Sequence, residues 1–345
     1  MSDKLSQLPD ELLVSILSQL TLREAVVLSC LSSRWRYIWT RVTRLNFNLP
    51  IPIEEWDCKD TEFCRKEASR HIDWVNHVLA LHKSKSNCHL EEFSVSCLFQ
   101  DSFQCEVDKW LNLALATKVE SLKIELFYRH YWRENHACFN LKDLFGFQNL
   151  KVLTLCGVDV DSQVVKMFLS SCALLEHLSI QQSNQLQHLD IIGPSLKLKH
   201  LEIQYCQMLS SLKINQSVNL VSFNFEGTET NFELDIVTSV LDVHIDTCFF
   251  PSLSGLVTTL ATKFTQLVML SLKVYSVQLE DYYSLPKLNN LKQLMLSVTS
   301  AIDCSLIGIP PLLDASPNLQ KFEIEVCTNL SLFFSFKCSS SVLFK

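Results

Sequence analysis

The chain has 345 residues, of which 48% are hydrophobic and 19% are charged, and its formal net charge is −7. This length corresponds to about two domains or to one extended repeat array. The small share of charged residues excludes wholesale disorder. The negative net charge argues against a general nucleic-acid-binding protein, because such a protein needs a basic surface to displace counterions from phosphates.

The sequence carries no signal for a membrane or a secretory route. No uncharged apolar run approaches the ~18 residues of a membrane span, and Met1–Lys4 lacks the basic-then-apolar pattern of a secretory signal. We therefore expect a soluble, intracellular protein in the cytoplasm, the nucleus or both. The fourteen cysteines include no Cys-x-x-Cys pair, so reduced thiols are expected rather than a disulfide framework.

Residues 1–41 are predicted to form a small helical unit that precedes a repeat. Pro9, Asp10 and Glu11 indicate the start of a helix, because proline suits its first position and acids suit the positive end of its dipole. This helix carries an apolar stripe of Leu12, Leu13, Ile16, Leu17 and Leu20.

Two further helices are predicted in the same unit. Thr21 and Glu24 have the spacing of a capping box and begin the second helix. Trp35 and Trp39 lie four residues apart and therefore share one face of the third helix. Because a unit of about forty residues cannot bury much surface by itself, we expect exposed apolar area on it.

A short apolar pattern recurs from residue 42 onward. Segments of the form apolar-x-x-apolar-x-apolar begin at eleven positions, namely Val42, Leu90, Val119, Leu150, Leu175, Leu198, Leu220, Val240, Leu267, Leu291 and Leu319. From Leu90 to Leu319 they follow one another at intervals of 20–31 residues, close to the ~20–29 of leucine-rich repeats. Each segment predicts a strand whose first, fourth and sixth positions face a shared core.

These repeats fix the expected fold class and domain boundaries. Residues 42–89 are expected to hold the first strand and a connecting helix, which Ile72, Val75 and Val78 indicate by their helical spacing. Residues 90–327 are expected to form a leucine-rich-repeat solenoid. The fold class is therefore α/β, with three N-terminal helices followed by a curved parallel sheet built from irregular repeats of about 20–31 residues.

The convex side of the solenoid is predicted to change along the chain. Between Leu175 and Val240 the repeats are only 20–23 residues long, and two more copies of the pattern occur at half phase, at 186–191 and 209–214. Such short repeats leave little room for helices, so these segments are predicted to be extended. The longer repeats are predicted to carry helices at 162–170, 254–263 and 306–315.

The end of the chain, residues 328–345, is an apolar tail after the last repeat. It either forms a makeshift last layer or leaves the terminal repeat of a truncated product without a cap. Because solenoids need a polar cap for solubility, we expect this tail to be poorly ordered or prone to aggregation.

No catalytic, metal or cofactor site is predicted. The six glycines are too scattered for a phosphate-binding loop. His71, His77 and His82 do not share one helix face, as metal ligands on a helix would. Most cysteines lie at strand ends or in apolar stretches, away from groups that would activate a thiolate. We therefore expect a protein that is not an enzyme.

Two N-terminal segments, Leu8–Leu20 (LPDELLVSILSQL) and Ala25–Trp39 (AVVLSCLSSRWRYIW), resemble the F-box. With the repeats, Asp73–Lys85 and Pro310–Ile324, the chain resembles plant F-box/leucine-rich-repeat proteins of the F-box/FBD/LRR group, without the C-terminal FBD domain. The resemblance implies that residues 1–41 are an F-box that docks on a Skp-type adaptor, and through it on a cullin. It also implies a non-catalytic subunit of a ubiquitin ligase that recruits a protein substrate.

The motif carries adaptor-facing roles over to nine residues, namely Leu8, Pro9, Glu11, Leu12, Ile16, Leu17, Val27, Leu28 and Trp35. An apolar cluster on a unit too small to hide it has the composition of an interface core. The alternative for Trp35 and Trp39 is that they pack the helices against the first repeat.

The concave face of the solenoid supplies the candidate substrate-binding residues. Since side chains alternate along a strand, those at even positions after each repeat start share this face. The candidates are His177, His200, Glu202, Asn224, Glu226, Asp242, His244 and Asp246. They include four acids and no lysine or arginine, whereas phosphate readers use arginine clusters. We therefore expect a basic or polar protein segment as substrate, although a merely solvated face remains an alternative.

Two other functions stay open. One is a leucine-rich-repeat scaffold that binds partners without coupling to a ligase. The other is a small-molecule-sensing receptor of the same architecture, for which the middle concave face lacks phosphate-binding cations but does not exclude an apolar ligand.

Overall fold

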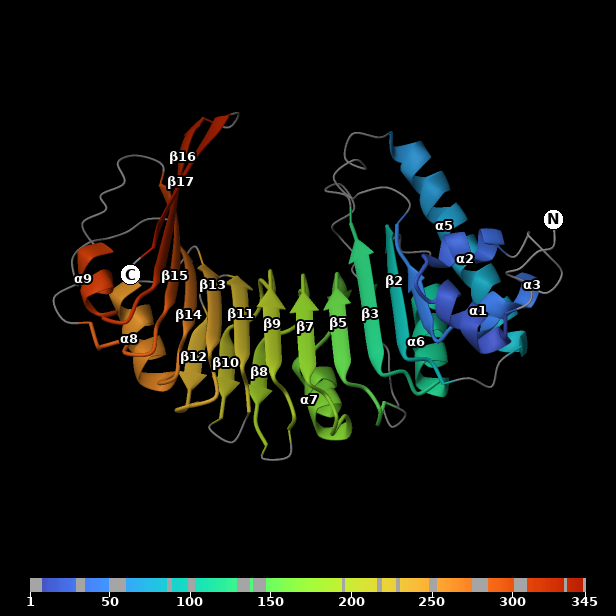
Figure 1. Cartoon of the computed structure of the whole chain (residues 1–345), viewed down its shortest axis with the longest axis horizontal. Coiled ribbons are helices and arrows are strands. Elements are labelled where there is room, and N and C mark those ends of the chain that lie inside the picture. Colours follow the sequence, from blue (N-terminus) through green and yellow to red (C-terminus); the bar gives the residue numbers. More distant parts are fainter. Residues whose placement is uncertain are drawn as a thin grey trace. The chain divides into compact units, whose positions relative to one another are not determined.

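A computed structural model describes residues 8–28, 35–49, 60–85, 89–98, 103–128, 137–138, 147–193, 196–215, 219–227, 230–247, 253–274, 285–300, 309–331 and 334–343. The chain divides into two compact units, Met1–Asp159 (unit 1) and Val160–Lys345 (unit 2). Both contain helices and mainly parallel strands (Figure 1).

Unit 1 begins with the predicted helices. They are α1 (Asp10–Leu17), α2 (Leu22–Leu28), α3 (Trp35–Ile38) and the 3-10 turn η2 (Trp39–Arg41). Pro9 is the N-cap of α1, one position before the predicted one, with an extended backbone at φ −56° and ψ 150°. The burial of Trp35 and Trp39, each 3% exposed, ties the third helix into unit 1.

The capping box at the start of α2 is confirmed. The backbone N–H and the hydroxyl of Thr21 both donate to Glu24 Oε2 at 2.8 Å. In return, the Glu24 N–H donates to Thr21 Oγ1 at 3.3 Å. These hydrogen bonds lower the pKa of the Glu24 carboxyl, because they favour its charged form. The box fixes where α2 begins.

Four parallel strands of unit 1 lie side by side in chain order, namely β1 (Arg44–Phe47), β2 (Glu92–Leu98), β3 (Ser121–Phe127) and β5 (Val152–Cys156). The long helix α5 (Thr61–Lys85) connects β1 to β2, as predicted, and α6 (Gln104–Ala116) connects β2 to β3. The short strands β4 (Ala137–Cys138) and β6 (Val158–Asp159) pair with each other.

Both connecting helices form because one face of each is apolar. In α5, Cys64, Ala68 and Ile72 repeat every fourth residue and are buried. In α6, which the repeat pattern does not predict, Val107 and Trp110 lie on the buried face. Burial of these faces against the sheet holds the helices in place.

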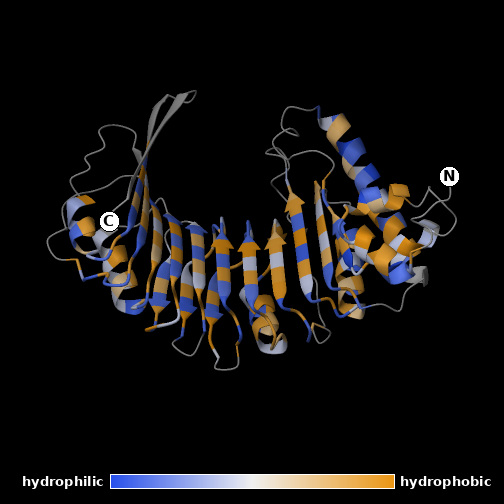
Figure 2. Cartoon of the chain, viewed as in Figure 1, coloured by the Kyte–Doolittle hydropathy of each residue, from blue (hydrophilic) through white to orange (hydrophobic). Residues whose placement is uncertain are grey.

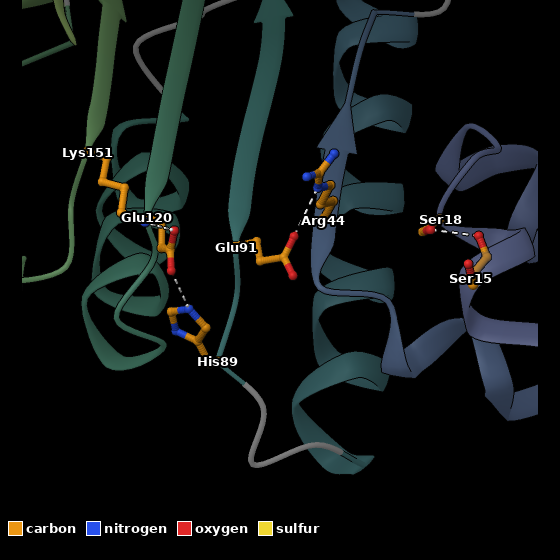
Figure 3. A network of polar contacts seen from close by, with 7 residues as sticks. All are labelled: Ser15, Ser18, Arg44, His89, Glu91, Glu120 and Lys151. Atoms are coloured by element: carbon orange, nitrogen blue, oxygen red, sulfur yellow. Dashed lines mark hydrogen bonds and ion pairs between the residues drawn. The ribbon is translucent and has the colours of Figure 1, made fainter. Parts of the chain in front are cut away.

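Charged side chains pair across the starts of the strands in unit 1 (Figure 3). Arg44 Nε donates to Glu91 Oε2 at 3.1 Å. Glu120 accepts from Lys151 Nζ at 2.6 Å and lies 3.3 Å from His89 Nε2, and these contacts lower the pKa of the Glu120 carboxyl. Such exposed pairs fix side-chain positions more than they add stability.

Unit 2 contains seven of the predicted repeat strands. They are β7 (His177–Gln181), β9 (His200–Gln204), β11 (Ser222–Gly227), β13 (Asp242–Thr247), β14 (Met269–Val274), β15 (Gln293–Ser300) and β16 (Lys321–Ser331), and neighbours in this order are parallel. In both units, every predicted strand begins two residues after its repeat start. The leucine-rich-repeat prediction is therefore confirmed strand by strand.

The apolar positions of these strands point into the core. In β9, Leu201 and Ile203 are at most 1% exposed, while Glu202 between them is only half-buried. Figure 2 shows this alternation of hydrophobic and hydrophilic residues along the strands. In unit 2, Phe225 packs edge-to-face on Phe232 with ring centroids 5.0 Å apart, an arrangement that aromatic pairs favour.

The convex side of unit 2 follows the predicted pattern with one addition. The half-phase segments form β8 (His188–Ile191) and β10 (Ser211–Ile214), and a third strand, β12 (Asn231–Leu234), completes a parallel sheet in the order β12-β10-β8. The pattern missed β12 because Glu229 occupies its first apolar position. The predicted helices are α7 (Ser162–Ser171), α8 (Leu253–Lys263) and α9 (Ile309–Asp314).

The tail after the last repeat continues one strand and adds another. Strand β16 runs to Ser331, and β17 (Phe334–Leu343) returns antiparallel along it, from Ser331↔Phe334 to Lys321↔Leu343. The return strand pairs backbone groups at the edge of β16, which a terminal parallel strand would otherwise leave open. The expectation that the tail is poorly ordered or prone to aggregation stays a prediction. Residues 332–333 and 344–345 of the tail lie outside the described residues.

Candidate functional site

Unit 1 presents exposed apolar side chains on its first two helices. Leu12 and Ile16 on α1 are 52% and 41% exposed, and Val27 on α2 is 68% exposed. Leu20, in the turn after α1, is 37% exposed. Several large apolar side chains exposed on so small a helical unit are typical of a surface that another protein covers.

Glu11, the charged residue among the adaptor-facing candidates, lies near Arg41 of the same unit. Arg41 Nη1 donates to Asp10 Oδ2 at 3.1 Å, and its Nη2 lies 3.9 Å from Glu11 Oε1. Glu11 remains 78% exposed. Of the other candidates, Pro9 is exposed, whereas Leu8 and Leu28 are half-buried.

Two predicted adaptor-facing residues lie inside unit 1 instead. Leu17 is 1% exposed and Trp35 is 3% exposed, so neither side chain reaches the surface. For Leu17 the reason is that α1 has two apolar faces, with Leu13 and Leu17 turned to the core and Leu12 and Ile16 to the outside. The burial of Trp35 and Trp39 agrees with the alternative that these rings pack the helices, and η2 contacts α5.

The concave candidates of unit 2 form three rows across β7, β9, β11 and β13. The strand register places them in the rows His177–His200–Ser222–Asp242, Ser179–Glu202–Asn224–His244 and Gln181–Gln204–Glu226–Asp246. Because the register is the same from strand to strand, residues far apart in sequence become direct neighbours. All eight predicted substrate-binding residues belong to these rows.

Hydrogen bonds and a ring contact link neighbouring side chains within the first row and within the second row. Asn224 Nδ2 donates to Glu202 Oε1 at 3.1 Å, and His244 Nδ1 lies 2.8 Å from Ser271 Oγ on β14. The rings of His177 and His200 are 5.8 Å apart. Burial lowers the pKa of His177 and of His244, so these two rings are neutral near pH 7 and do not offset the acids.

The third row contains a cation that the prediction did not include. Lys273 on β14 is in register with Asp246, and its Nζ donates to Asp246 Oδ2 at 2.6 Å. Asp246 is only 5% exposed, so this ion pair neutralises it. The rule that selected the concave residues also selects Lys273 once it is applied to the repeat that starts at Leu267.

Tyr205, directly after β9, is a second residue that the pattern missed. It is 49% exposed and its backbone is left-handed, with φ 53°. Its hydroxyl is hydrogen-bonded to Glu226, which raises the pKa of Tyr205 to about 12. Burial raises the pKa of Glu226 and of Asp242, because it disfavours their charged forms. No cation pairs with Glu202, Glu226 or Asp242 among the ion pairs of the described residues.

The part of the chain that the structure describes contains neither a metal-binding cluster nor a membrane-spanning helix. No cluster of three or more His, Cys, Asp or Glu side chains there has the geometry to hold a metal ion. Within the same residues, no helix combines the length and the apolar character required to cross a membrane.

Comparison with known protein families gives two matches. Residues 5–47 match the F-box domain, and residues 134–339, more than half of the chain, match the family described as At1g61320/AtMIF1, LRR domain.

Curated proteins of Arabidopsis thaliana are similar to the chain. They include the F-box/FBD/LRR-repeat protein At5g56420 (28% identity over 68% of this chain and 53% of that protein). They also include the putative F-box/LRR-repeat protein At5g54820 (27% identity over 71% and 56%) and the putative FBD-associated F-box protein At5g56440 (30% identity over 56% and 47%). The chain therefore spans about half the length of the curated relatives it matches.

Proposed function

Because the chain belongs to the At1g61320/AtMIF1 leucine-rich-repeat family and carries an F-box domain at its N-terminus, we propose that it is a substrate-recognition subunit of a Skp–cullin–F-box ubiquitin ligase. In this role the F-box docks on a Skp-type adaptor, and the repeats bind a protein substrate. The transfer of ubiquitin belongs to partner subunits, and this chain is not a catalyst.

The observation that carries the proposal is the exposed apolar surface of the F-box helices. Leu12, Ile16 and Val27 are between 41% and 68% exposed. Complete burial of a fully exposed side chain of this kind is worth about 1.5–3 kcal/mol, so covering the exposed part of all three favours binding of the adaptor. Leu17 and Trp35 act from inside, by holding α1 and α3 in position.

For the substrate, we propose a basic or polar protein segment bound without phosphate. Glu202, Glu226 and Asp242 lie in adjacent rows with no cation paired to them among the described residues. A lysine or arginine of the substrate would supply the missing opposite charge. Lys273, the cation beside the third row, is already paired with Asp246. One paired lysine is not the arginine cluster that phosphate recognition needs.

The adaptor role is tested by capture of the recombinant chain with a Skp-type adaptor and a cullin. The test variant is Ile16→Asp/Val27→Asp, and the matched control is Ile236→Asp/Leu241→Asp, because these residues of unit 2 are similarly exposed, at 54% and 42%. We expect the test variant to lose about tenfold or more in adaptor affinity and the control to bind like the parent.

Two results would count against the adaptor role. Equal binding of the parent and the Ile16→Asp/Val27→Asp variant would move the contact away from this surface. Failure of a well-folded parent to capture the adaptor would favour the alternative of a leucine-rich-repeat scaffold that is not coupled to a ligase.

A further inference from the structure

A groove of about 410 Å³ lies in unit 1 between α2 of the F-box and α5. Figure 1 shows the two helices near each other within unit 1. Its α2 wall contains Arg23, Val26 and Val27, and its α5 wall contains Arg70 and Trp74. The volume is within the ~300–1,000 Å³ of pockets that bind ligands.

The Arg23 side chain lies against the Trp74 ring in this groove. The Arg23 Cζ atom lies 4.7 Å from the centroid of the Trp74 ring, as in a cation–π contact. A guanidinium carries five N–H donors, so Arg23 can contact the ring and still donate to an acceptor. No carboxylate forms an ion pair with Arg23 among the described residues.

The other ionisable side chains of the groove do not neutralise Arg23. Glu67 is paired with Arg70 on the same helix. His71 is 3% exposed, and burial together with the nearby Arg23 lowers its pKa to about 4. His71 is therefore uncharged near pH 7, and the groove has a net positive charge from Arg23 in a chain whose net charge is −7.

We propose that this groove is a docking site for an acidic, apolar segment of a partner protein other than the adaptor. A carboxylate of that segment accepts from an N–H group of Arg23, and a neighbouring apolar side chain packs on Val26 and Trp74. Arginine and tryptophan are the residues that most often dominate protein interfaces, and here they are preorganised by their own contact. The proposal goes beyond adaptor and substrate binding, and it uses neither α1 nor the concave rows.

The groove and the proposed adaptor surface are distinct in their main residues. Leu12 and Ile16 of α1 do not line the groove. Val27 lies at its border and is assigned to the adaptor surface, so the proposed segment does not depend on it. Arg23 and Trp74 therefore allow the groove to be altered without changing α1.

The test uses the full chain and a fluorescein-labelled peptide in which glutamate alternates with leucine and phenylalanine, followed by fluorescence anisotropy. We expect the parent to bind this peptide, and the Kd to rise about tenfold or more for Arg23→Glu. Arg65→Glu is the matched control, because it makes the same charge change on an exposed position of α5 outside the groove. A second variant, Arg23→Lys, keeps the charge but loses the planar guanidinium, and an intermediate Kd is expected.

Three results would overturn the proposal. The first is no binding of the peptide by the folded parent, or equal binding by Arg23→Glu. The second is equal binding of a peptide in which glutamine replaces every glutamate. The third is displacement of the peptide by a Skp-type adaptor, which would assign the groove to the adaptor. Adaptor capture by Arg23→Glu, measured in parallel, separates these results from a failure of the proposed ligase role.

Discussion

At the residue scale, His71 connects the core of unit 1 to its surface groove. Its Nε2 lies 3.1 Å from the backbone oxygen of Ser96 on β2, and its ring is 5.7 Å from that of Trp74. The hydrogen bond to Ser96 favours the charged ring, but burial and Arg23 outweigh it, and the pKa is lowered to about 4.

This pKa makes the stability of unit 1 depend on pH. The unfolded chain binds a proton on His71 near pH 6.5, whereas the folded chain binds it only near pH 4. Stability is therefore complete above pH ~6.5 and is lost as the pH falls toward 4. Between pH 7 and 5 we expect a loss of about 2 kcal/mol from His71, with His82 acting in the same direction because burial also lowers its pKa.

Urea unfolding midpoints at several pH values provide the measurement. We expect the pH dependence to be smaller in His71→Gln than in the parent. His77→Gln, an exposed position on the same helix, serves as the control and should keep the parent's dependence. An unchanged slope in His71→Gln would show that His71 is not the titrating group.

At the scale of single elements, the apolar spacing predicts that a segment is helical or extended, but it does not always predict which face is inside. The stripe of α1 contains both core and surface residues, since Leu13 and Leu12 lie next to each other in sequence and point to opposite environments. Only packing against α3 and η2 decides between them. Trp35 is a second example: the F-box motif predicts it at the surface, and packing within unit 1 buries it.

The strand β17 carries a prediction of its own. A chain that ends at Ser331 would expose the backbone N–H and C=O groups of β16 that β17 now pairs. Open strand edges promote association with other chains, so we expect this variant to form oligomers or aggregates in size-exclusion chromatography with light scattering. A chain that ends at Leu343 keeps all of β17 and is the control. A monodisperse, equally stable variant ending at Ser331 would contradict the capping role.

At the scale of the whole molecule, the proposed function needs two surfaces, one on each unit. The F-box side chains that face outward lie in unit 1, and the concave rows lie in unit 2. The two can be changed independently, since no residue belongs to both. A ligase subunit requires both, whereas a scaffold requires only the second.

The concave rows are tested by charge reversal. The variant Glu202→Lys/Glu226→Lys/Asp242→Lys should lose binding of an arginine-rich peptide probe, because repulsion replaces attraction. It should keep adaptor capture. Asp246 is left unchanged because it is buried and paired with Lys273. The control, Asp190→Lys/Glu233→Lys/Asp235→Lys, makes the same net charge change in or beside the three-stranded sheet of unit 2. If the concave variant bound the peptide as well as the control variant and the parent do, the substrate would bind elsewhere.

The sequence by itself determined the class of fold and the position of the repeat strands. Their apolar positions recur at fixed offsets, and a strand with that pattern can bury them in only one register. It also identified the concave rows, since alternation along a strand is a local property. The tertiary structure decided what depends on neighbours: the burial of Leu17 and Trp35, the pairing of Lys273 with Asp246, and the groove under Arg23. These contacts join residues that are far apart in the sequence. The apolar spacing within one segment therefore cannot predict them.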